Sequence, residues 1–150
     1  LKFRFDVAMT GRLGMEMKPS DLSPSELEYA KKAVEAYKEI RPIIQQGNQY
    51  RILSPYEKTG YASELYITDD KSDAVFFAYK YEHYVNQERP RFHFAGLDPN
   101  ATYKLTEICR NGRTDHWEGH TFTGKFLMNQ GVEIAFGGQF SSKVIRLIKQ

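Results

Sequence analysis

The longest helical pattern in the sequence covers residues 23–47. Apolar residues recur there at steps of three and four, which places them on one helix face opposite most of the lysines and glutamates. Ser23 and Glu26 have the spacing of a capping box, so the helix is expected to begin here. Pro42 lacks an amide hydrogen and clashes with the preceding turn, so we expect it to end or kink the helix, and Gly47 supplies the final stop.

The pattern before this helix alternates. Polar and apolar residues alternate along residues 2–9, which predicts a half-buried strand. Two glycines follow within TGRLG at 10–14 and permit a tight turn. A strand, a glycine loop and a capped helix form one βα unit, which normally has parallel-sheet neighbours. The apolar side of the expected strand carries Phe3, Phe5, Val7 and Met9.

From residue 48 onward, short apolar segments alternate with polar turns. Closely spaced short strands of this kind predict an antiparallel sandwich. The expected strands are 50–53, 61–67, 74–81, 91–95, 103–108, 121–122, 132–135 and 142–148. The sequence therefore predicts an α+β protein, with one N-terminal strand and a long helix over 1–47 followed by an antiparallel β-sandwich over 48–150. The first part reads as the end of an α/β domain whose remainder lies outside this sequence.

Composition and charge narrow the classes of function. The chain is 41% hydrophobic and 14% aromatic, as in globular proteins. Its net charge of +2 comes without a basic block, and no apolar run approaches the roughly 18 residues of a membrane span, so neither nucleic acid nor membrane is expected as a partner. The single Cys109 cannot form an internal disulfide; it slightly favours the cytoplasm and leaves a periplasmic or secreted location open.

Several residues of chemical interest have ordinary explanations. His116 and His120 have a spacing that binds zinc on a helix, but the residues around them disfavour a helix, so we expect no metal site. The acids of the turn at 69–73 are expected to face solvent and bond their own backbone. Trp117 could offer a face for stacking on a sugar, although a scattered aromatic in a β domain more often belongs to the core. Asp6 is expected to form a salt bridge to a neighbouring helix.

Read as a whole, the chain resembles the C-terminal portion of glycoside hydrolase family 36 α-galactosidases. The resemblance rests on ordered segments and departs from the family at TGKFLMN (123–129), where a lysine and a phenylalanine replace acidic positions. The segments are FDVAMTGRLGMEM (5–17), the stretch 22–55, DKSDAVFFAY (70–79), GLDPNATYKL (96–105), FLMNQG (126–131) and FSSKVIRLI (140–148). The resemblance implies a (β/α)₈ barrel whose last βα unit is 1–47 and a C-terminal β domain over 48–150.

The resemblance also implies a retaining hydrolysis of terminal α-galactosides by two aspartates. In the family both aspartates precede the region that matches this chain, so we assign no catalytic residue, cofactor or metal here. Because barrel active sites form at the loops after the strands, Met9, Gly11 and Arg12 are the candidate substrate-binding residues of the intact enzyme. The alternative is that the glycines only serve the turn.

Three hypotheses follow from the sequence. The first is a non-catalytic C-terminal part of an α-galactosidase, which braces the barrel or an oligomer, with the rest of the enzyme as partner and an α-galactoside as its substrate. The second is a free-standing carbohydrate-binding sandwich that uses exposed aromatics such as Trp117. The third is a structural module whose helix stripe drives formation of a homo-oligomer.

Overall fold

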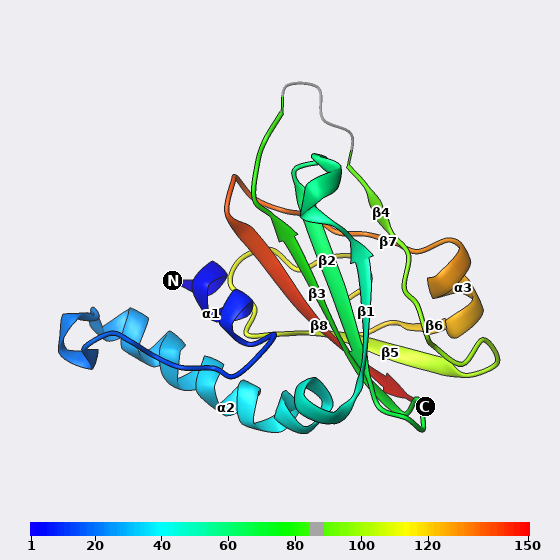
Figure 1. Ribbon diagram of the computed structural model, residues 1–150, viewed down its shortest axis with the longest axis horizontal. Helices are drawn as coiled ribbons and strands as arrows, with labels where there is room; N and C mark the ends of the chain where they lie inside the picture. The colour runs from blue at the N-terminus through cyan, green and yellow to red at the C-terminus, as the bar shows by residue number, and fades with distance from the viewer. Residues whose placement is uncertain (85–88) are drawn as a thin grey trace.

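A computed structural model describes residues 1–84 and 89–150. Its centre is a six-stranded antiparallel sheet with the order β1-β2-β3-β8-β5-β6, so the last strand of the chain lies in the middle (Figure 1). The strands of this sheet are β1 (Asn48–Leu53), β2 (Tyr61–Ile67), β3 (Asp73–Lys80), β5 (Thr102–Ile108), β6 (Thr121–Thr123) and β8 (Ser141–Lys149). A second, two-stranded sheet pairs β4 (Arg91–Phe92) with β7 (Val132–Glu133).

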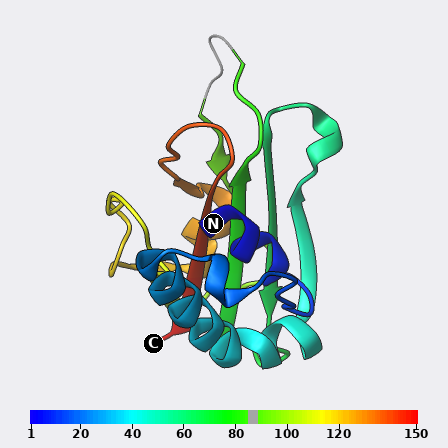
Figure 2. The ribbon, with the colours of Figure 1, turned by 90° about the vertical axis from the view of Figure 1, so that its left-hand side faces the viewer.

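The large sheet is covered on both faces. One face packs on α1 (Lys2–Ala8) and α2 (Pro24–Gln46), which lie together on one side of the molecule (Figures 1 and 2). The other face packs on the small sheet, on α3 (Gly124–Asn129) and on the connecting loops. This double cover explains the nearly unbroken apolar run of β3, because its side chains alternate between two buried layers. The α+β class with an antiparallel sandwich is therefore confirmed.

The strand expected at 2–9 is wrong, because these residues form helix α1. The segment lies across β8 and pairs with no strand among the described residues, so an extended backbone would leave its amides and carbonyls unpaired on an apolar surface. A helix pairs them internally. The four-residue spacing then buries Phe5 and Met9 side by side and leaves Val7 47% exposed.

Helix α2 begins as expected and ends later than Pro42. The Ser23 hydroxyl accepts from the Glu26 amide at 3.4 Å, and the Glu26 carboxylate accepts from the Ser23 amide at 3.0 Å, which completes the capping box. Pro42 lies inside the helix on its exposed side, so it does not end it. Ile43 and Ile44 are buried beyond it, and their burial holds the last turn on the sheet until Gly47.

The remaining elements are short. Two 3₁₀ turns, Pro19–Asp21 and Pro55–Glu57, precede α2 and follow β1. Helix α3 was not expected from the sequence; the Thr123 hydroxyl caps it by accepting from the Phe126 amide at 3.1 Å. No helix in the described part of the chain has both the length and the apolar character needed to cross a bilayer.

Candidate functional site

Three tyrosine hydroxyls hold the segment 6–11, which runs from the end of α1 into the loop at residues 10–15. This loop after α1 carries Gly11 and Arg12, two of the candidate substrate-binding residues. The tyrosines come from α2, β2 and β3, and each donates to a backbone carbonyl of this segment. The pairs are Tyr37 to Gly11 at 2.6 Å, Tyr66 to Thr10 at 2.9 Å and Tyr79 to Asp6 at 3.0 Å. We call them the tyrosine anchors. They connect the loop to the helix layer and to the central sheet at once.

The tyrosine anchors from the sheet are held in their neutral form. Burial raises the pKa of both Tyr66 and Tyr79 well above the usual range, and nearby carboxylates, Glu64 first, raise it further. A neutral phenol keeps its proton and can donate it to a carbonyl. These two bonds are therefore insensitive to pH across the physiological range.

The structure separates the three candidate substrate-binding residues. Met9 is fully buried in the core between the helices and the sheet, whereas Gly11 and Arg12 are exposed. Gly11 has no positive φ, and a Cβ atom there would meet nothing within 4 Å. The turn therefore does not require glycine at this position, and the backbone is open to approach from outside. A shallow hollow of about 200 Å³ lies beside it, lined by Arg4, Phe5, Ala8, Leu13, Gly14, Met15, Glu16 and Met17.

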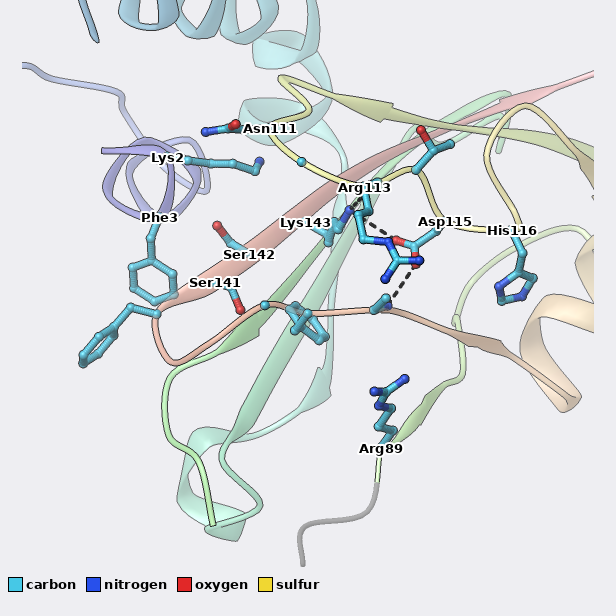
Figure 3. Close-up of a pocket in the computed structure, with 16 residues that line it drawn as sticks. Lys2, Phe3, Arg89, Asn111, Arg113, Asp115, His116, Ser141, Ser142 and Lys143 are labelled. Atoms are coloured by element: carbon cyan, nitrogen blue, oxygen red, sulfur yellow. Dashed lines mark hydrogen bonds and ion pairs between the residues drawn. The ribbon is translucent and has the colours of Figure 1, made fainter. Parts of the chain in front are cut away.

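A larger cavity of about 590 Å³ lies at the other end of α1 (Figure 3). Its walls are the start of α1, the start of β8, the loop 111–116 and the segment 135–137. We call it the β8 cavity. Figure 3 shows that Lys143 and Asp115 lie close together at its wall, while Arg89 and His116 come from other segments.

A buried ion cluster supports the wall of the β8 cavity. The Lys143 ammonium contacts Glu107 at 2.8 Å and Asp115 at 3.2 Å, and it donates to the Arg113 carbonyl at 3.2 Å. Asp115 also accepts from the Ala135 amide at 3.1 Å. One cation thus faces two carboxylates in a place where unpaired charge is costly. Burial raises the pKa of Glu107, and Lys143 opposes that rise.

A third buried carboxylate belongs to α1 itself. Asp6 is fully buried, pairs with Lys2 at 2.7 Å and accepts from the Ser142 hydroxyl at 2.7 Å. Its partner therefore lies one turn away on its own helix, and not on the neighbouring helix that the sequence suggested. Burial raises the pKa of Asp6, and Lys2 lowers it. The carboxylate helps fix α1 to β8.

The Glycosyl hydrolase family 36 C-terminal domain matches residues 61–147. The chain belongs to glycoside hydrolase family 36. It is 32% identical over its whole length to the probable alpha-galactosidase C of Aspergillus flavus, of which it covers 18%.

Solved structures of family 36 enzymes share the fold. A variant of alpha-galactosidase AgaA from Geobacillus stearothermophilus, crystallised with raffinose, matches 99% of this chain with a TM-score of 0.86 and 27% identity. The alpha-galactosidase from Lactobacillus brevis matches 99% with a TM-score of 0.84 and 31% identity. The chain spans about a fifth of the length of each of these relatives.

The other residues considered from the sequence have structural roles in this family 36 domain. Asp70 accepts from the Ser72 amide at 3.0 Å within its own turn, as expected, and Asp73 pairs with Arg146 at 2.8 Å. Trp117 is fully buried in the core, so it offers no sugar-stacking face. Across residues 1–84 and 89–150, no group of three or more His, Cys, Asp or Glu side chains is arranged to hold a metal ion.

The ion cluster at the β8 cavity was not expected from the sequence. Glu107 carried one signal, because it continues the buried side of β5 after Tyr103 and Leu105. An acid at an apolar position of an alternating strand calls for a buried cation. Its partner Lys143 could not be named from the sequence, because the two residues lie 36 positions apart in the chain and meet only through the pairing of β5 with β8.

Proposed function

We propose that this chain is the C-terminal part of a retaining α-galactosidase, in which it contributes structure rather than catalytic groups. One observation carries the proposal. The whole chain aligns with proteins named as α-galactosidases, and it shares its fold with AgaA over 99% of its length. The enzyme would hydrolyse terminal α-galactosides, and the rest of the polypeptide would be the partner of this chain.

The two catalytic aspartates of such an enzyme would lie outside these 150 residues. Retaining hydrolysis needs two carboxyl groups about 5–5.5 Å apart on either side of the scissile bond. The buried carboxylates of this chain have other partners: Asp6 pairs with Lys2, while Glu107 and Asp115 share Lys143. A carboxylate held by a lysine in the core is poorly placed to attack a sugar, which supports assigning no catalytic residue here.

In this proposal residues 1–47 join the barrel to the C-terminal β domain at 48–150, and they do so as helices α1 and α2, because residues 2–8 form a helix and not the last barrel strand. Tyr37 and Ile40 of α2 pack with Phe77 and Val144 of the sheet, which holds the helices on the β domain. Because α2 buries its apolar stripe on the chain's own sheet, the stripe gives no reason for self-association. An oligomer of the enzyme would therefore use other surfaces.

The loop after α1, at residues 10–15, is where this bracing would affect substrate binding. We propose that Gly11 and Arg12 face the α-galactoside, and that Met9 acts by anchoring the backbone from the core. Gly11 would let the backbone approach a sugar, and the Arg12 guanidinium would donate to its hydroxyls. The tyrosine anchors would hold the loop at the geometry that binding requires.

Hydrolysis of a chromogenic α-galactoside tests the proposal. The 150-residue chain and the full-length polypeptide that carries it are assayed side by side. We expect the longer protein to be active and the chain alone to be silent. Activity of the chain alone would overturn the assignment of no catalytic residue, and silence of both would overturn the α-galactosidase function.

The Arg12→Ala variant of the full-length protein tests the loop. Loss of one charged donor predicts a KM increase of about tenfold. Arg41→Ala is the matched control, because Arg41 is exposed on α2. An unchanged KM for Arg12→Ala would remove Arg12 from the proposed substrate site.

A further inference from the structure

We propose that the β8 cavity binds a small organic anion, in which one carboxylate or phosphate group is joined to an apolar ring. The proposal does not rest on the hydrolytic function, because residues of this chain alone line the cavity. The cavity volume of about 590 Å³ lies within the roughly 300–1,000 Å³ of small-ligand sites. The charges of the lining favour an anion, and its aromatic rings favour an apolar body on that anion.

Positive side chains outnumber negative ones in the lining of the β8 cavity. The four cations are Lys2, Arg89, Arg113 and Lys143, and the one carboxylate is Asp115. Both lysines are already paired with buried carboxylates: Lys2 with Asp6, and Lys143 with Glu107 and Asp115. The two arginines therefore decide the charge that is available to a ligand.

Neither of these two arginines pairs with a carboxylate in the part of the chain that the structure describes. The arginine ion pairs found there belong to Arg91, Arg110 and Arg146. Arg89 lies just before β4 and Arg113 in the loop 111–116, and Figure 3 shows their guanidinium groups turned toward each other. A guanidinium group presents a planar fork of donors that matches the oxygens of a carboxylate or a phosphate. An anion in the cavity would supply the acceptors that these donors lack.

The negative groups near the β8 cavity are buried, whereas its unpaired positive groups are exposed. The side chains of Asp6, Glu107 and Asp115 are 0%, 1% and 4% exposed. Arg89 and Arg113 are both exposed. A ligand that enters the cavity therefore meets the guanidinium groups before it meets a carboxylate. Clefts whose accessible charges have one sign attract ligands of the opposite sign, which here is negative.

Aromatic side chains in the lining of the β8 cavity favour an anion with an apolar body. Phe3, Phe136 and Phe140 line the cavity, and the rings of Phe3 and Phe140 meet edge to face at 5.6 Å. The Phe140 side chain is 60% exposed. An inorganic anion would leave this ring in water, whereas a ring or hydrocarbon chain on the ligand would cover it, which is favourable.

Ligand-observed NMR and calorimetry test this site on the 150-residue chain and on the full-length protein. The probes separate charge from ring: benzoate and phenyl phosphate carry both, benzyl alcohol carries only the ring, and inorganic phosphate carries only the charge. We expect benzoate or phenyl phosphate to bind both proteins with a dissociation constant of about 1 mM or below. Benzyl alcohol and inorganic phosphate should bind at least about tenfold more weakly. Comparison of benzoate with phenyl phosphate identifies the preferred anionic group.

Variants with matched controls assign the binding to the β8 cavity. Arg89→Ala and Arg113→Ala should each weaken binding of the preferred organic anion about tenfold, because each removes a charged donor. Phe140→Ala should weaken it about threefold, because it removes an apolar contact. Arg41→Ala and Phe126→Ala change exposed residues outside the cavity and should leave binding unchanged. Circular dichroism is used to confirm that each variant is folded.

Four results would overturn the proposal. The first is that neither organic anion binds, and the second is that benzyl alcohol or inorganic phosphate binds as tightly as the organic anions. The third is binding by the 150-residue chain alone and not by the full-length protein. The fourth is that both arginine variants bind the organic anion as tightly as the Arg41→Ala control. None of these results depends on whether the full-length protein hydrolyses an α-galactoside.

Discussion

Replacement of Lys143 by methionine tests how the centre of the sheet tolerates buried charge. Methionine keeps most of the length and apolar stem of lysine but removes its ammonium. Glu107 and Asp115 would then be left buried without their shared cation, since their side chains are only 1% and 4% exposed. Lys143 lies on β8, which pairs with β3 on one side and β5 on the other.

The expected cost is large. Breaking a buried ion pair from one side typically destabilises a protein by about 3–5 kcal/mol, because a buried charge loses its compensation. A typical free energy of unfolding is about 5–15 kcal/mol, so this one change would remove a substantial part of it. The exposed pair of Lys149 with Asp98 gives the matched control, and Lys149→Met should cost below about 1 kcal/mol.

The cost should depend on pH in a defined direction. Burial already raises the pKa of Glu107 in the folded protein, and loss of Lys143 removes an opposing influence, so the variant should raise it further. A folded state that holds a proton more tightly than the unfolded chain loses stability as pH rises above the unfolded pKa, about 4.3 for Glu. The destabilisation should therefore be small near pH 4 and larger near pH 7.

Urea unfolding followed by circular dichroism measures these differences. A triple variant that combines Lys143→Met with Glu107→Gln and Asp115→Asn replaces both carboxylates by neutral amides and should recover more than half of the lost stability. The reasoning is refuted if Lys143→Met unfolds at pH 7 within about 1 kcal/mol of the parent chain, or if its cost is the same at pH 4.

Three further variants test single contacts by thermal or urea unfolding. Tyr79→Phe removes the donor to the Asp6 carbonyl and should cost about 1–3 kcal/mol; an unchanged melting temperature would contradict the anchor. Ser23→Ala removes the cap of α2 and should cost about 1 kcal/mol, whereas equal stability would mean that the cap contributes nothing. Gly131→Ala would force a Cβ atom into the Phe92 carbonyl at a φ of +65° and should cost more than about 1 kcal/mol; a tolerated alanine would disprove that crowding.

Much of the fold could be predicted because its signals are local. The capping box at Ser23 acts over three positions and gives the start of α2. The turn residues and the apolar segments between them are equally local, and they give the positions of β1 to β8. The family resemblance, which rests on the order of whole segments, is likewise confirmed by the domain match.

The errors occur where a distant part of the chain decides the outcome. Residues 2–9 alternate like a strand, yet they lie across β8, where only a helix satisfies their backbone. Pro42 ends no helix because burial of Ile43 and Ile44 outweighs the lost hydrogen bond.

The candidate sites depended even more on the fold. The tyrosine anchors join residues 26, 56 and 73 positions apart, and the ion cluster depends on β8 lying between β3 and β5. None of these distances can be obtained from spacing along the chain. Met9 shows the same limit, since its place in the core follows from the helical form of α1.

We propose that the sheet, through the tyrosine anchors, holds the loop after α1 at the geometry that substrate binding would require. Its most direct test is the kcat/KM of the full-length protein carrying both Tyr66→Phe and Tyr79→Phe, measured at 25 °C after circular dichroism has confirmed that the variant is folded. The control is Tyr103→Phe, which removes a hydroxyl that donates to the Lys71 carbonyl at 2.9 Å and accepts from the Asp98 amide at 3.0 Å, in the core on the other face of the sheet. We predict that the double variant loses about tenfold or more in kcat/KM while the control keeps its activity. Equal kcat/KM in the double variant and the control would contradict the claim.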